Sequence, residues 1–137
     1  MTATKLISTN DESAVHAVLD AVYAAWADNN PDAFVAPYAA DATAVHSGTV
    51  MEDREAIRAT MAAVFDGPLK GSRGIHHVQR IRFVGADTAI VLSHGAILFA
   101  GQTEPAAESR TLDGWVLCKQ DGSWRVESFH NCPEDTA

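Results

Sequence analysis

The chain has 137 residues and a formal net charge of −8, from 18 acidic against 10 basic residues. This length is typical of one domain, and we expect a single domain over residues 1–137, ordered from about residue 10 to about residue 133. The basic residues are scattered, whereas a protein that binds nucleic acid or an anionic membrane concentrates them on one face. We therefore expect neither nucleic acid nor a membrane as a partner.

Three features of the chain predict a cytoplasmic location. The segment from Met1 to Ser13 lacks the basic flank and apolar core of a secretion signal. The longest apolar stretch, Ala86 to Ala100, is interrupted by polar residues and is shorter than the roughly 20 residues of a membrane span. Cys118 and Cys132 are too far apart along the expected C-terminal hairpin for a disulfide, and free thiols are typical of a reducing compartment.

The first part of the chain is predicted to be mainly helical. Thr9 to Glu12 has the spacing of a capping box, and the apolar residues that follow at helical intervals predict a helix from about Asn10 to Ala27. Pro31 suits the first position of a second, short helix, whose buried side Phe34 and Tyr38 would mark.

A strand and a third helix are expected next. Ala42–His46 has the composition of a strand and ends at the turn Ser47-Gly48. Asp53 can cap a helix that carries an apolar face and ends at Gly67-Pro68.

The period of the apolar residues then changes from about 3.6 to 2, which indicates strands. Turn residues separate four such runs, which we expect to be antiparallel. They are Ile75–Val84, Thr88–Phe99, Glu108–Lys119 and Ser123–Asn131. Helices at one end of the chain and strands at the other predict an α+β fold in which the two layers bury their apolar faces on each other.

Three segments carry a resemblance to a known group of proteins. They are Ala25–Ala33, Tyr38–Thr43, and Asp121–Val126 followed by His130 and Asn131. With the element order, they resemble the SnoaL-like superfamily, which includes polyketide cyclases, ketosteroid isomerase, scytalone dehydratase and nuclear transport factor. The resemblance implies a cone-shaped half-barrel, in which a strongly bent, mostly antiparallel sheet wraps around a long N-terminal helix with two shorter helices.

Within that group, Gly74–His77 and the ending Trp124–Val126 with Phe129–Asn131 are most similar to the SgcJ/EcaC-type proteins of enediyne antibiotic biosynthesis. That resemblance implies a bacterial natural-product protein that holds a small apolar, unsaturated ligand of polyketide type in a conical pocket.

His46 is the first candidate for chemistry. In ketosteroid isomerase the strand that matches Ala42–His46 ends in a proton-shuttling aspartate, so the resemblance implies that His46 is a general base. A histidine titrates near neutrality and could do the same work. A structural histidine bonded to a backbone carbonyl is the alternative, and both interpretations stay open.

Two oxyanion donors of that isomerase are compared with Tyr23 and Val116. Tyr23 lies one residue from the register of the first donor, a rotation of about 100° on a helix. The second donor matches Val116, which cannot donate a hydrogen bond, so the resemblance disfavours steroid-type isomerisation. Tyr23 is kept as a catalytic candidate.

His130 is the third catalytic candidate. It lies in phase with Trp124 and Val126, so if that face looks into the cone, His130 reaches the pocket and Asn131 turns away, unless a bulge intervenes. A histidine that anchors the strand end through backbone hydrogen bonds is the alternative. The residues expected to contact a ligand are aromatic or polar. They are Trp26, Phe34, Tyr38, His94, Trp115 and Asn131.

The sequence offers no sign of a cofactor or metal site. It contains neither a glycine-rich phosphate loop after a strand nor any short metal-binding spacing. The resemblance, with an apolar interior that contains a few histidines, implies as first hypothesis a small-molecule-binding protein, with or without acid–base assistance. The alternatives are an isomerase, cyclase or dehydratase with His46 as base, and a protein-interaction subunit. Apolar residues on both faces of Glu108–Lys119 predict a homodimer formed through the sheet.

Overall fold

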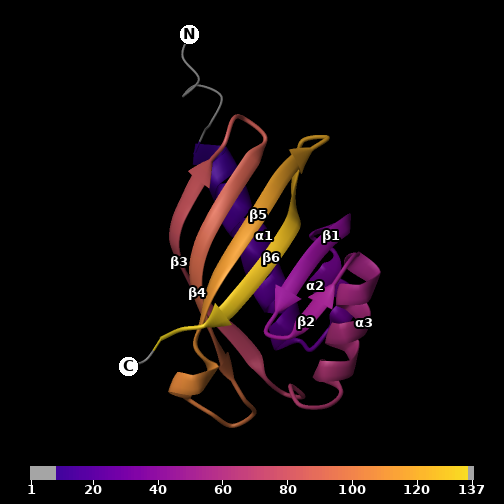
Figure 1. The fold of residues 1–137 in the computed structure, drawn as a ribbon, viewed down its shortest axis with the longest axis vertical. Helices are drawn as coiled ribbons and strands as arrows, with labels where there is room; N and C mark the ends of the chain where they lie inside the picture. The colour runs from indigo at the N-terminus through magenta and orange to yellow at the C-terminus, as the bar shows by residue number, and fades with distance from the viewer. Residues whose placement is uncertain (1–8, 136–137) are drawn as a thin grey trace.

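The computed structural model describes residues 9–135, which form three α-helices and a curved sheet of six strands (Figure 1). Most of the segment in which no secretion signal is expected, residues 1–8, lies outside the described residues. Within residues 9–135, no helix combines the length and the apolar character that crossing a membrane would require.

Helices α2 and α3 begin at the residues that their capping patterns predict, and α1 begins one residue before the expected start. Helix α1 spans Thr9–Ala27 and buries residues spaced three or four apart, namely Val15, Leu19 and Val22. In α2 (Pro31–Val35), the Asn30 side chain accepts a hydrogen bond from the Ala33 amide. Asp53 accepts one from the Ala56 amide at the start of α3 (Arg54–Phe65).

The sheet has the strand order β2-β1-β6-β5-β4-β3. Strands β3 to β6 form an antiparallel meander as expected, whereas β1 runs parallel to β6 and antiparallel to β2. The strands are β1 (Tyr38–His46), β2 (Thr49–Met51), β3 (Arg73–Phe83), β4 (Thr88–Leu98), β5 (Thr111–Gln120) and β6 (Ser123–Pro133). The sheet does not close, and α1 passes behind β3 to β6 in Figure 1 while α2 and α3 stand beside β1 and β2. This is the cone-shaped α+β fold that the sequence predicts.

Several element boundaries differ from the expectation. Tyr38 begins β1 and does not extend the second helix, because the chain after Pro37 pairs with β6 through the bond from the Val126 amide to the Pro37 carbonyl. Strand β2 was not predicted. Glu108 lies in a single 3₁₀ turn, in which the Ser109 hydroxyl donates a hydrogen bond to the Ala106 carbonyl (2.8 Å). Strand β5 therefore begins three residues after Glu108.

A bulge in β6 decides which side chains face α1. The register shifts by one residue at Glu127, between Val126 and Ser128. Residues after the bulge exchange faces, because successive side chains alternate across a strand. Phe129 therefore follows Val126 on the inner face, and the expectation that His130 shares that face is wrong.

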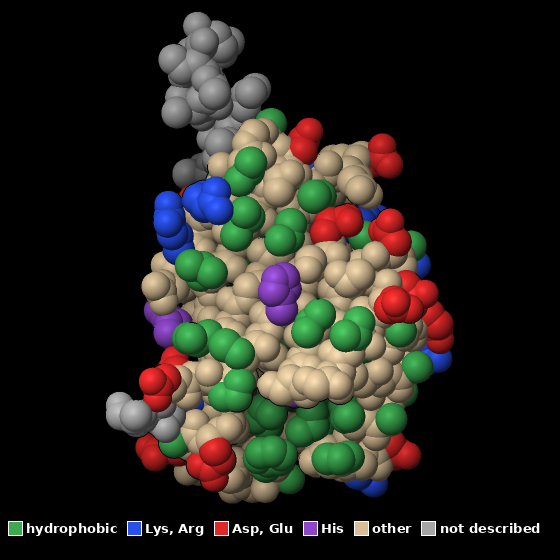
Figure 2. All heavy atoms as spheres, viewed as in Figure 1, with side chains coloured by type: hydrophobic (Ala, Val, Ile, Leu, Met, Phe, Trp, Pro, Cys, Tyr) green, Lys and Arg blue, Asp and Glu red, His purple; other side chains and the backbone are tan. Residues whose placement is uncertain are grey.

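The outer face of the sheet carries apolar side chains among small and polar ones. Figure 2 shows this face, with green side chains scattered over β3 to β6 and acidic side chains mainly at its edges. Leu92, Leu112 and Val45 are 47%, 42% and 43% exposed there, which is high for large apolar side chains next to buried strand neighbours.

Candidate functional site

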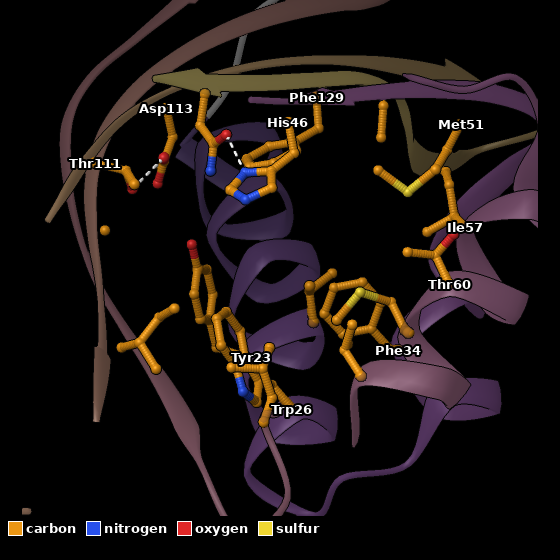
Figure 3. A pocket seen from close by; sticks show the side chains of 18 of the residues that line it. Tyr23, Trp26, Phe34, His46, Met51, Ile57, Thr60, Thr111, Asp113 and Phe129 are labelled. Carbon is orange, nitrogen blue, oxygen red and sulfur yellow. Dashed lines mark hydrogen bonds between the residues drawn. The ribbon is translucent and has the colours of Figure 1, made fainter. Parts of the chain in front are cut away.

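A cavity of about 280 Å³, hereafter the pocket, lies between α1, α3 and the inner face of the sheet (Figure 3). Trp26 and Phe34 line it from the first two helices, and Ile57 and Thr60 from α3. Most of the lining is apolar. Polar side chains gather on the strand side in a group that we call the polar wall, formed by His46, Thr111, Asp113 and Asn131.

His46, the last residue of β1, is held by Asn131 of β6. Its Nδ1 lies 2.7 Å from the Asn131 side-chain oxygen, as the dashed line in Figure 3 marks. An amide oxygen only accepts, so Nδ1 carries the hydrogen and Nε2 of the neutral ring is left as an acceptor. Asn131 can reach His46 because the β6 bulge turns it to the inner face. The arrangement selects the tautomer that presents a base.

Among residues 9–135, only hydroxyl groups form hydrogen bonds to the Asp113 carboxyl. It is 4% exposed, and the Thr111 hydroxyl donates to its Oδ1 at 2.7 Å. The Ser93 hydroxyl, which accepts a hydrogen bond from the Trp115 indole at 3.1 Å, donates to the same carboxyl. Burial raises the pKa of Asp113, and the two hydroxyl groups oppose that effect only in part.

Gly95 of β4 makes room for this carboxyl. A Cβ at Gly95 would lie 2.6 Å from Asp113 Oδ2 and 2.8 Å from Thr111 Oγ1, closer than real side-chain contacts allow. The absence of a side chain at this position lets the carboxyl lie against the backbone of the neighbouring strand.

Tyr23 of α1 presents its hydroxyl to the pocket. Its ring stacks on His76 with centroids 4.0 Å apart, and Figure 3 shows its oxygen directed toward the polar wall. Among residues 9–135 no hydrogen bond to this hydroxyl is formed. Burial, and next the charge of Asp113, raises the pKa of Tyr23 far above its ordinary value, so the group stays a hydrogen-bond donor.

The pocket thus brings a donor, a buried carboxyl and a base to one space. Tyr23 can donate to a ligand oxygen, and His46 can accept a proton through Nε2. Among residues 9–135 no group of three histidine, cysteine or acidic side chains is arranged to hold a metal ion.

Residues 8–130 match the SnoaL-like domain family. The chain belongs to the SnoaL-like family. A solved domain of unknown function with a cystatin-like fold from Nostoc punctiforme is 31% identical, with a TM-score of 0.88 over 95% of this chain and 81% of that one. No curated protein matches the chain.

Two more distant solved structures share the fold alone. An NTF2-like protein from Novosphingobium aromaticivorans is 16% identical, with a TM-score of 0.80 over 98% of this chain and 89% of that one. A ketosteroid isomerase-like protein from Erwinia carotovora atroseptica is 18% identical, with a TM-score of 0.70 over 87% and 92% of the two chains.

In this SnoaL-like chain, six of the nine residues singled out from the sequence line the pocket. They are Tyr23, Trp26, Phe34, Tyr38, His46 and Asn131. The roles suggested for them stay predictions. For Tyr23, the one-residue offset from the family register does not keep the side chain out of the pocket.

The other three residues lie elsewhere. His130 is exposed on the outer face because of the β6 bulge. His94 is also outside the pocket, with Nδ1 2.7 Å from Glu134 and Nε2 2.6 Å from Gln79. Trp115 is 3% exposed and lies behind the pocket surface, where it packs on Phe129.

Sequence reasoning missed Asp113. It compared the second donor of the isomerase with Val116, and from that valine it inferred that a second donor is absent. Val116 does not line the pocket, whereas Asp113 does, so the comparison fell on a residue outside the site. A usable signal was present, because Asp113 is in phase with Trp115 and Leu117, and a lone acid on the inward side of an apolar strand points to a site.

Proposed function

We propose that the pocket binds a small, largely apolar, unsaturated molecule of polyketide type, and that the protein serves bacterial natural-product biosynthesis of the enediyne or polyketide kind. The observation that carries the proposal is a largely apolar cavity with a few polar groups on one wall, the usual form of a small-molecule site. The resemblance to the SgcJ/EcaC-type proteins supports the ligand class.

The size of the pocket supports a compact ligand or one end of a longer one. Its volume of about 280 Å³ is the volume that about nine water molecules occupy in liquid water, and it is at the low end for ligand sites. The stacked rings of Tyr23 and Trp26, 6.0 Å apart, and the nearby Phe34 favour a flat, conjugated group.

Filling the pocket tests this proposal. Thr60 of α3 lines the pocket, whereas the adjacent Ala59 is exposed. In calorimetric titration with 2-acetylnaphthalene, a flat aromatic ketone, we expect Thr60→Trp to bind at least about tenfold more weakly than the wild type because the new ring occupies the space. Ala59→Trp, the matched control, should bind as the wild type does. Equal binding by all three proteins would place the ligand outside the pocket.

An acid–base isomerase, cyclase or dehydratase is the second candidate. It is favoured by His46 Nε2, which faces the pocket as a base while Tyr23 faces it as a donor. Nε2 would take a proton from the carbon beside a ligand carbonyl, and Tyr23 would stabilise the negative charge that develops on the oxygen. Return of the proton to another atom of the same ligand completes an isomerisation without any co-reactant.

We also propose a homodimer formed through the outer face of the sheet. The exposed Leu92, Leu112 and Val45 support it, because contact between two copies of this face would remove these apolar side chains from water. Light scattering at micromolar concentration should give the mass of two chains. A monomer at that concentration would contradict the proposal.

A further inference from the structure

The charged groups around the pocket are unbalanced. Its lining contains one carboxyl, Asp113, and neither lysine nor arginine among residues 9–135. The only other titratable side chains in the lining are Tyr23, Tyr38 and His46. Burial raises the pKa of both tyrosines, so they are uncharged donors. A ligand in the pocket therefore meets a carboxyl and neutral hydrogen-bonding groups.

His46 does little to balance an anion. It is exposed at the end of β1, and its Nδ1 hydrogen is already donated to Asn131. The groups that hold Asp113 are the neutral hydroxyls of Thr111 and Ser93. An anionic ligand would lose its hydration without gaining a buried cation, and it would also approach a carboxyl.

The Tyr23 hydroxyl defines what the ligand must offer. Its ring is fixed by stacking on His76, and no hydrogen bond reaches the hydroxyl from residues 9–135. The hydroxyl opens on the pocket, so a ligand that brings an acceptor oxygen can accept its hydrogen bond and is favoured over a ligand that cannot.

We infer that the pocket selects uncharged ligands with a hydrogen-bond-accepting oxygen, such as ketones, quinones and esters, and rejects carboxylates of the same shape. The selection rests on the proposed function, since it concerns the ligand of the same pocket. It also constrains the preceding reaction, which must deliver the ligand without a free carboxylate, as an esterification, a decarboxylation or a thioester-forming step does.

A matched pair of ligands tests the selection. 2-Acetylnaphthalene and 2-naphthoate have nearly the same shape, and at pH 8 the second carries a negative charge. In calorimetric titrations of the full chain we expect the ketone to bind about 100-fold more tightly, because juxtaposed like charges without a counterion cost several kcal/mol.

Asp113→Asn should reduce this preference, since the amide keeps the shape of the side chain and removes its charge. We expect 2-naphthoate to bind at least about tenfold more tightly to this variant than to the wild type. Asp87→Asn, the same change at an exposed turn between β3 and β4, is the control and should leave both affinities unchanged. Circular dichroism confirms that each variant is folded.

Tyr23→Phe gives a second measurement that does not depend on Asp113. It should weaken binding of the ketone about tenfold by removing the donor. The outcomes separate the two proposals. If 2-naphthoate binds the wild type as tightly as the ketone, the selection is wrong and the pocket remains a ligand site. If neither compound binds, the proposed function fails and the selection fails with it.

Discussion

Two buried carboxyl groups near opposite ends of β5 differ in their partners. Asp11 of α1 accepts hydrogen bonds from the Lys119 amine and the Trp124 indole, each at 3.1 Å. Asp113 receives its hydrogen bonds from the Thr111 and Ser93 hydroxyls and faces the pocket. Both are less than 10% exposed. One carboxyl thus has a lysine amine and an indole donor beside it, whereas hydroxyl groups hold the other and the charges of His94 and His76 act on it only as smaller effects.

The difference fits a structural role for Asp11 and the ligand-directed role that we propose for Asp113. At Asp11 a positive charge and two donors offset the loss of hydration, so the group fastens the start of α1 to the sheet. At Asp113 the offset is incomplete, and burial raises the pKa. A folded chain retains an incompletely compensated buried acid mainly where a ligand or a reaction uses it.

The test with the largest expected effect asks whether the side chains that line the pocket carry out proton transfer. With 2-acetylnaphthalene in heavy water, exchange of the methyl protons followed by nuclear magnetic resonance reports abstraction beside the carbonyl. His46→Gln retains hydrogen bonding and cannot act as the base, so we expect exchange to slow by about 100-fold or more. His46→Ala should slow it equally.

Binding affinity provides the control for this experiment, because His46→Gln should change the ketone affinity by less than about threefold if the residue acts on the reaction. Exchange that continues at the wild-type rate in both variants would show that His46 only orients the ligand or supports the strand end.

A second test substitutes each buried acid with its amide. Asp11→Asn removes the charge that Lys119 faces, and we expect the free energy of unfolding to fall by about 1 to 2 kcal/mol. Asp113→Asn removes a poorly compensated charge and should leave the stability equal or higher. Urea titrations of both variants measure the contrast. A larger loss at Asp113 than at Asp11 would reverse the assignment of roles.

The sequence predicted the helices and the meander because both depend on local patterns. Capping residues such as Asn30 and Asp53, and the spacing of apolar residues, act over a few neighbours. The bulge at Glu127 has no such pattern, yet it moves His130 out and brings Asn131 beside His46. Strand β2 was missed because its three residues are too few for a periodic signal.

The candidate site was predicted only in part for the same reason. His46 and Trp26 could be placed from the strand end and the helix face that they occupy. Predicting that Asp113 belongs to the site would have required knowledge of the pairing of β5 with β4, which sets its carboxyl beside Gly95 and Ser93. That contact joins residues about twenty positions apart and depends on the curvature of the sheet.

The smallest expected effect is a difference in pH dependence between the two acids. Burial raises the pKa of Asp113 in the folded state above its value in the unfolded chain, so the folded state binds the proton more tightly. The contribution of this group to stability is therefore fully present below the unfolded pKa, near 4. It is lost as the pH rises through the folded pKa. The Asp113→Asn variant has no such contribution to lose, because an amide does not titrate. The stability of the variant relative to the wild type should then increase as the pH rises from about 4 and become constant once Asp113 is ionised in both states.

Urea titrations of the two proteins at successive pH values measure this difference, with Asp87→Asn as the control. A difference that stays the same at every pH would mean that the Asp113 carboxyl ionises in the folded protein as it does in the unfolded chain.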